Sequence, residues 1–272
     1  MRRRIASLGF LIAALSALSA EPAVPGFYLD QNLQASYNPL GLQLGTKLYC
    51  RMPLIKKSGI LWESTKIDIG MAHSLSPAYD FIGAYLDIEP IAIFDIAFST
   101  QFAGYYDGLG YGFHDLSGYD ASFDSTALKS LPSKNATGYI LSAAPTLKFA
   151  LESFAFADTL HVTHFDVDGG KGYFYETYAN CVLAKSDMEL YNDAYALLKV
   201  APEIMLGLND SILLVPASGY RSHTLQAVGI ISRNLSRRVS FYAALTAGTY
   251  LEDRYHRYEL RVAGMAGITS AL

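Results

Sequence analysis

Beyond residue 20, the 272-residue chain lacks any long apolar run. A membrane-spanning helix needs about 20 consecutive apolar residues, so this part of the chain does not cross a membrane by helices. Charged residues are also few, at 17 % of the sequence, against about 25 % in soluble domains. Because 51 % of the residues are nevertheless hydrophobic, the apolar side chains must be spread over short segments, which is typical of β-strands.

The chain also has little cysteine and little net charge. Cys50 and Cys181 are its two cysteines, too few for a disulfide scaffold. The net charge of −4 indicates no nucleic-acid partner. The Gly-x-Gly sequence at 110–112 has no strand-to-helix context for binding phosphate. We therefore predict no cofactor and no nucleic acid.

The first twenty residues predict a Sec signal peptide. Three arginines, at positions 2–4, precede an apolar stretch over 8–18, and small residues follow before Glu21. Cleavage after Ser19 or Ala20 would remove this segment, and we predict that residues 21–272 form a single domain. A single N-terminal membrane anchor is the alternative, which the shortness of the apolar stretch disfavours.

The remainder of the chain alternates between apolar and polar residues with period two. Around residue 45, for example, one face carries Leu42, Leu44 and Leu48, and the other carries Gln43 and Lys47. This alternation predicts strands with one apolar and one polar face. We predict about twelve strands, within a range of 10–14, over residues 27–37, 41–52, 64–75, 79–89, 92–106, 138–151, 157–167, 193–206, 211–218, 222–232, 238–250 and 256–268.

A soluble β-sandwich would show the same alternation, but three features favour a membrane barrel. The predicted strands run about 10–15 residues, longer than the usual 5–6. Tyrosines such as Tyr28, Tyr139 and Tyr258 lie near strand ends, where an aromatic girdle would sit. The signal peptide directs the chain to the compartment where such barrels occur.

In architecture the chain resembles Gram-negative outer-membrane β-barrel proteins as a class. The resemblance implies an all-β fold, a transmembrane antiparallel up-and-down β-barrel of about 12 strands. It also implies a location in the cell outer membrane, contact with its lipid, and insertion by the barrel-assembly machinery. A soluble secreted β-protein is the alternative.

Connection lengths predict which end of the barrel faces outward. Outer loops of such barrels are long and periplasmic turns are short, so the connections 107–137 and 168–192 are expected outside. The periplasmic turns are then predicted at Glu89-Pro90, at 152–156 and at 208–210, and both chain ends lie in the periplasm. Cys50 and Cys181 fall at opposite ends, so no disulfide is expected between them.

The charged residues of the predicted strands share the polar face, which in such a barrel lines the lumen. The predicted lumen-facing charges are Lys47, Lys66, Asp68, Asp95, Lys148, Glu152, Lys199, Glu203, Glu259 and Arg261. Twelve strands enclose more space than the side-chain-filled barrels of eight strands. We therefore expect either a narrow passive pore for small polar solutes or a barrel closed by its loops, which then act as a surface.

One local cluster has the residue types of a metal site. Asp166 and Asp168 share a strand face and lead into Gly169-Gly170, which could hold calcium. A strand end with an Asp-Gly turn explains the same residues, and His161 and His164 point to opposite faces. We predict no metal.

A lipid hydrolase of the outer membrane is the alternative function. It needs a serine and a histidine within hydrogen-bond reach. Ser222-His223 and His73-Ser74 are adjacent pairs, but neighbours on a strand face opposite ways. We therefore predict no catalytic residues and no enzymatic activity.

Overall fold

The computed structural model describes residues 23–38, 41–55, 57–107, 113–168, 170, 172–177 and 179–272. The predicted signal peptide, residues 1–20, lies outside these ranges. Among the described residues, no helix is both long enough and apolar enough to span a bilayer.

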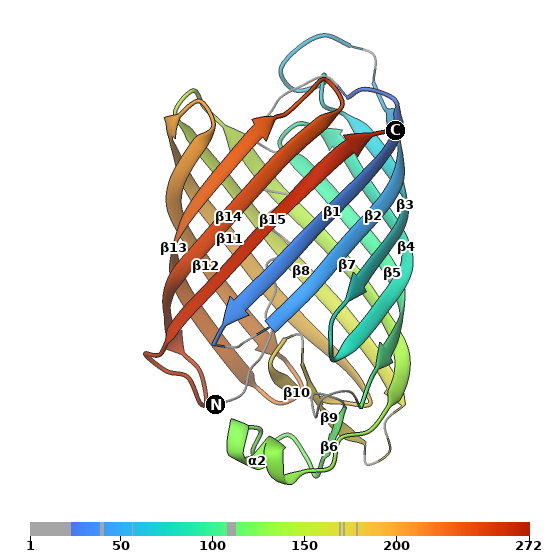
Figure 1. Ribbon diagram of the computed structural model, residues 1–272, viewed down its shortest axis with the longest axis vertical. Coiled ribbons are helices and arrows are strands. Elements are labelled where there is room, and N and C mark those ends of the chain that lie inside the picture. Colours follow the sequence, from blue (N-terminus) through green and yellow to red (C-terminus); the bar gives the residue numbers. More distant parts are fainter. Residues whose placement is uncertain are drawn as a thin grey trace.

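Twelve long strands form one closed antiparallel barrel, as predicted (Figure 1). Every strand pairs with the barrel strands before and after it, and the first strand pairs with the last. A closed sheet leaves no unpaired edge, so backbone N–H and C=O groups are satisfied within the sheet. The strands are β1 (Gly26–Tyr37), β2 (Gly41–Pro53), β3 (Lys66–Leu75), β4 (Tyr79–Ile91), β5 (Phe94–Tyr105), β7 (Ala136–Ala150), β8 (Phe154–Asp168), β11 (Ser186–Ala201), β12 (Ile204–Val215), β13 (Tyr220–Asn234), β14 (Val239–Glu252) and β15 (Leu260–Ala271).

Period-two alternation separates an apolar outer face from a polar inner face. Leu44 and Leu147 point outward, with 41 % and 51 % of their surface exposed. Their neighbours Gln43 and Thr146 point inward, with 4 % and 2 % exposed. This inside-out pattern is that of a transmembrane barrel, whose outer face contacts lipid.

The two ends of the barrel differ in their connections. The terminal rim, where β1 begins and β15 ends, has the connections 54–65, 92–93, 151–153, 202–203 and 235–238. The loop rim, at the opposite end, has 38–40, 76–78, 106–135, 169–185, 216–219 and 253–259. The two longest connections, 106–135 and 169–185, therefore lie at the same rim, as predicted.

Those two connections together form a plug at the loop rim, below the barrel in Figure 1. The plug consists of β6 (His114–Leu116), β9 (Tyr173–Glu176), β10 (Cys181–Ala184) and a short helix, α2 (Ser125–Ser130). The three strands form a small sheet in the order β10-β9-β6. Asp124 caps the helix by accepting hydrogen bonds from the N–H groups of Thr126 and Ala127.

Two predicted turns are wrong, because residues that favour turns lie within strands. Glu89 and Pro90 belong to β4, where a bulge between Ile88 and Ile91 accommodates the proline, and the chain turns at 92–93 instead. Residues 208–210 lie within β12. The chain turns at Pro202-Glu203, so β11 begins at Ser186 rather than at 193.

Candidate functional site in the barrel lumen

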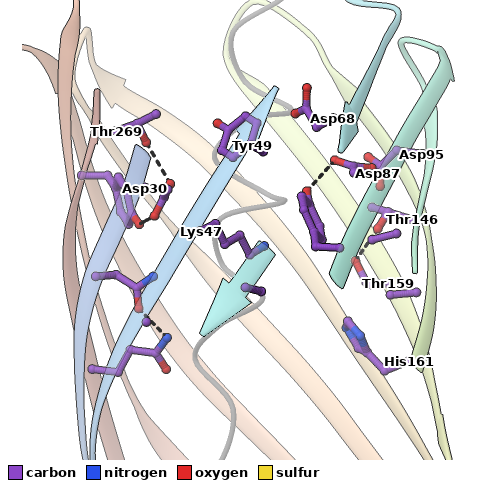
Figure 2. Close-up of a pocket in the computed structure, with 18 of the residues that line it drawn as sticks. Asp30, Lys47, Tyr49, Asp68, Asp87, Asp95, Thr146, Thr159, His161 and Thr269 are labelled. Carbon is purple, nitrogen blue, oxygen red and sulfur yellow. Dashed lines mark hydrogen bonds between the residues drawn. The ribbon is translucent and has the colours of Figure 1, made fainter. Parts of the chain in front are cut away.

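The lumen holds a cavity of about 880 Å³. Its lining begins at the terminal rim, with the turn residues Glu152, Glu203 and Arg237, and extends to Asn180 of the plug. The cavity is therefore a cup that opens at the terminal rim and is closed at its other end by the plug. Figure 2 shows that polar side chains point into it from opposite walls.

The wall formed by β2 to β7 carries a network of ion pairs. Glu89 accepts from the ammonium groups of Lys66 at 3.0 Å and Lys148 at 3.1 Å, and Lys148 also contacts Asp95 at 2.6 Å. Arg51 forms a two-point ion pair with Asp68, at 2.7 and 2.9 Å. These buried charges compensate one another, so the network is fixed in place and neutralised largely within the wall.

One lumen cation is held differently. The ammonium of Lys47 lies 4.5 Å from the centre of the Tyr85 ring, and within the described chain no carboxylate forms an ion pair with it. The Tyr85 hydroxyl donates to Asp87 at 3.2 Å. Figure 2 shows Lys47 between Asp30 on one wall and Asp87 on the other. Lys47 therefore presents its charge to the cavity rather than to the wall.

The opposite wall, on β8 and β11 to β15, carries fewer charges, namely Glu189, Asp193 and Arg261, and is more filled. Hydroxyl groups pair across strands there, Ser211 with Thr224 at 2.8 Å, and at its border with β7, Thr159 with Thr146 at 3.0 Å. An inward apolar cluster that includes Tyr195, Met205 and Ile230 fills the part nearest the terminal rim. Asn209, at the centre of the mispredicted turn, faces inward and donates to Asp193 at 2.6 Å.

The outer end of the cup is sealed by aromatic packing. Phe113 and Phe174 stack at 5.0 Å, and Phe123 stacks on Tyr175 at 5.9 Å. All four side chains are buried, together with Cys181 and Leu183. Barrel residues join this core, since the Tyr105 hydroxyl donates to Glu176 at 3.2 Å.

Two ionisable groups inside the plug are held neutral by burial. Burial raises the pKa of the Cys181 thiol well above its usual value, and the nearby carboxylates Glu189 and Glu176 act in the same direction. Burial also lowers the pKa of His114, and its Nδ1 atom is buried without a hydrogen-bond partner. The interior of the plug is thus a buried and mostly apolar core.

The structure places nine of the ten predicted lumen charges in or beside the lumen. Five line the cavity from within strands, and Lys148 is buried among its carboxylate partners. Glu152 and Glu203 lie in turns at the mouth of the cup, with Lys199 beside them. The five lining residues are Lys47, Lys66, Asp68, Asp95 and Arg261.

Glu259 differs from its prediction, because β15 begins at Leu260 rather than at 256, so Glu259 lies in the connection before the strand. It lies at the loop rim and accepts hydrogen bonds from His256 and Asn38, both at 2.8 Å. The hydrogen bond from His256 lowers the pKa of Glu259. Tyr258, with a φ of 65°, turns the chain just before the strand.

The cysteine and histidine predictions can be placed as well. Cys50 and Cys181 are both free thiols, as expected. His161 faces the lumen and His164 faces outward. Within the described chain, no three His, Cys, Asp or Glu side chains are grouped as metal ligands.

The two adjacent Ser-His pairs of the sequence do not come together, as expected, but a different serine and histidine do. His73 and His223 point outward and contact Asp80 at 2.7 Å and Asp210 at 2.6 Å, while Ser222 lines the lumen. The Nε2 atom of His164 lies 3.2 Å from the hydroxyl of Ser186 on the outer surface. Sequence reasoning missed this contact because it depends on the register between β8 and β11.

Comparison with solved structures gives the same fold. The β-domain of the Bordetella autotransporter BrkA superposes with a TM-score of 0.54 at 10 % identity, covering 91 % of this chain and 99 % of that one. An outer-membrane channel from Pseudomonas putida F1 gives 0.45 at 9 %, covering 92 % and 98 %. The porin NanC gives 0.44 at 7 %, covering 90 % and 100 %. No protein-family model and no curated protein sequence matches the chain.

At such low identity these similarities define the fold and nothing finer. The chain has the fold of the outer-membrane β-barrels, a transmembrane antiparallel up-and-down barrel of twelve strands.

Proposed function

We propose that this protein is an outer-membrane channel for small polar solutes, closed in this structure by the plug. The observation that carries the proposal is the polar cup of about 880 Å³, which runs from the terminal rim to the plug. A barrel with a purely structural role has no need for such a space, and smaller barrels fill theirs with side chains. The loop rim would face the outside and the terminal rim the periplasm, because long loops are typical of the outer side.

The plug acts as the gate in this proposal. It blocks the outer end by side-chain packing, while β6 and β9 pair with each other and not with a barrel strand. Its removal therefore leaves every barrel pairing in place. A single gate at one end, with fixed ion pairs along the wall, suits passage of neutral or zwitterionic solutes better than selection of one ion.

Planar-bilayer conductance tests the gate. Replacing residues 170–184 with a short Gly-Ser turn stops before β11 begins at Ser186, and we expect the single-channel conductance to rise clearly above that of the intact protein. Replacing 57–63 at the terminal rim in the same way is the matched control and leaves the conductance unchanged. Because the connection 106–135 supplies the rest of the plug, a second variant replaces residues 107–134 as well. If the barrel without either loop folds and stays silent, the lumen is blocked by its own wall, and the closed, surface-presenting barrel is the better interpretation.

The membrane face has its own test. Leu44→Arg places a charge on the outer face of β2 and should destabilise the inserted barrel by about 2–4 kcal/mol. Gln43→Arg, one residue away, points into the lumen and should cost much less. Urea unfolding in lipid vesicles, followed by circular dichroism, measures both. Equal costs would mean that the outer face does not contact lipid.

One contact supports a second candidate, hydrolysis of lipid esters at the outer surface. His164 and Ser186 are 3.2 Å apart on the outward face, near the loop rim, and Asp166 stands opposite Ser186 in the strand register. This is the spacing of a serine and its general base. Labelling by a fluorophosphonate probe that disappears in Ser186→Ala, with Ser222→Ala as control, would establish the activity; no labelling of the folded protein would exclude it.

A further inference from the structure

Four polar side chains interrupt the apolar outer face, on four neighbouring strands. We name Asp158, Asn192, Asp210 and His223 the outer polar patch. The Asn192 amide donates to Asp158 at 2.7 Å, and His223 contacts Asp210 at 2.6 Å. None of the four lines the lumen cavity.

The strand register shows that the patch is continuous. Ala194 on β11 is directly opposite Asp158 on β8 and also directly opposite Asp210 on β12. Ile212, between Asn192 and His223, forms the adjoining row. The two hydrogen-bonded pairs therefore lie side by side, separated by one alanine.

Its position makes the patch costly if it faces lipid. Asp210 lies in the middle of β12 and Asn192 in the inner part of β11, away from both rims. Charged groups on the lipid face destabilise a barrel most near the midplane, and ionisable groups within a membrane normally face protein or water. The side chain of Asp210 is nevertheless 47 % exposed.

The opposite outer wall has one comparable pair, at the loop rim: His73 and Asp80, 2.7 Å apart, lie at the ends of β3 and β4 nearest that rim. In the middle of β2 to β5 the outward side chains include Leu48, Met71 and Phe98, which are large, apolar and exposed. Around the patch the outward residues include the small Ala194, Ala196 and Ala227. Small residues let two membrane-embedded surfaces approach closely, and polar groups then pair between them.

We propose that the outer polar patch is the contact surface between two copies of this chain in the membrane. Each pair combines a carboxylate, which only accepts hydrogen bonds, with a group that carries N–H donors. Two copies related by a two-fold axis bring the same surface together, so the donors Asn192 and His223 of each copy meet the acceptors Asp158 and Asp210 of the other. Lipid headgroups lie at the rims and cannot supply such partners in mid-strand. The inference rests on the membrane location of the barrel.

Cysteine cross-linking in lipid vesicles tests the contact. In a Cys50→Ser background, Ala194→Cys should give a disulfide-linked dimer on oxidation, seen on a non-reducing gel. Ala84→Cys is the matched control, since Ala84 is an outward, exposed alanine in the middle of β4. Equal cross-linking of the two variants would overturn the proposal, as would an Ala194→Cys product heavier than a dimer.

A second experiment removes one of the two hydrogen-bonded pairs by substitution. The double variant Asp210→Leu, His223→Leu should dissociate at a concentration at least about tenfold higher than wild type, in sedimentation equilibrium in detergent. Wild-type protein that is monomeric at every concentration, or a folded double variant that dimerises as well as wild type, would refute the interface. Neither result bears on the proposal that the protein is a channel. Wild-type protein that stays dispersed without detergent would instead refute the membrane location.

Discussion

The two ends of the lumen are built from different chemistry. Near the terminal rim, the wall of β2 to β7 places charged residues in fixed pairs and the cup stays open beside it, while an apolar cluster around Tyr195 and Ile230 fills the opposite side. At the loop rim, stacked aromatic rings and buried aliphatic residues close it. Ion pairs built into strands hold a wall without filling the space beside it, whereas apolar groups gain stability only by contact. The barrel therefore keeps a polar space at one end and a removable seal at the other.

Removing the central cation of the charged wall is expected to have the largest effect. Lys148→Met leaves Glu89 and Asp95 buried without that partner, and breaking a buried ion pair costs about 3–5 kcal/mol. Guanidinium unfolding in lipid vesicles measures the loss.

Lys47→Met is the control for that experiment, because Lys47 contacts an aromatic ring rather than a carboxylate. A cation–π contact is worth only about 0.5–1 kcal/mol at an exposed site. Similar losses for both variants would mean that the ion pairs do not hold the wall.

A substitution in the core of the plug should weaken the seal without destabilising the barrel. Leu183 is fully buried in β10, and Leu183→Ala should weaken plug docking by about 3 kcal/mol. That corresponds to a roughly 100-fold larger undocked fraction, since about 1.4 kcal/mol is a factor of ten.

Cys181 reports this change, because its thiol is buried only while the plug is docked. In a Cys50→Ser background, maleimide should label Cys181 faster in the Leu183→Ala variant. Leu147→Ala, on the lipid face, is the control and should leave the labelling rate unchanged. If both variants label at the wild-type rate, the plug does not open as a unit.

The smallest expected effect is a response of the seal to acid. Burial lowers the pKa of His114 below its ordinary value near 6.5, and a backbone hydrogen bond at Pro132 and the charge of Asp107 oppose this only in part. Because the released plug binds the proton more readily, docking is at full strength above about pH 6.5 and weakens as the pH falls below it.

Single-channel recordings at pH 7.5 and 5.5 measure this response. We expect more frequent opening at pH 5.5 in wild type, and a flatter response in His114→Gln. An unchanged pH response in that variant would assign the effect to other groups.

Most of the fold could be predicted from the period-two alternation of apolar and polar residues. Leu44 beside Gln43 and Leu147 beside Thr146 assigned both faces, and connection lengths placed the two long loops at one rim. Turns were less readable, because Pro90 is tolerated at a bulge and Asn209 is satisfied inside the lumen by Asp193. No local pattern predicts such long-range partners.

The site was less predictable than the fold for the same reason. The inward phase of Lys66 and Asp95 could be predicted from their neighbours, but their pairing through Glu89 and Lys148 joins four separate strands. The plug was expected only as two loops that could fold inward. Its small sheet joins β6 to β9 across a wide sequence separation. The sequences of these short strands do not indicate that they pair.

The pairing of β1 with β15 also governs how the chain must fold. Tyr28 lies opposite Ala271, so the contact that completes the barrel joins the two extremes of the described chain. Contacts of such high sequence separation form slowly, and until the final strand arrives β1 exposes an unpaired edge that invites aggregation. Because β15 pairs with β1 on one side and with β14 on the other, it is the strand that closes the barrel, and its loss should leave an open sheet with unpaired edges on β1 and β14.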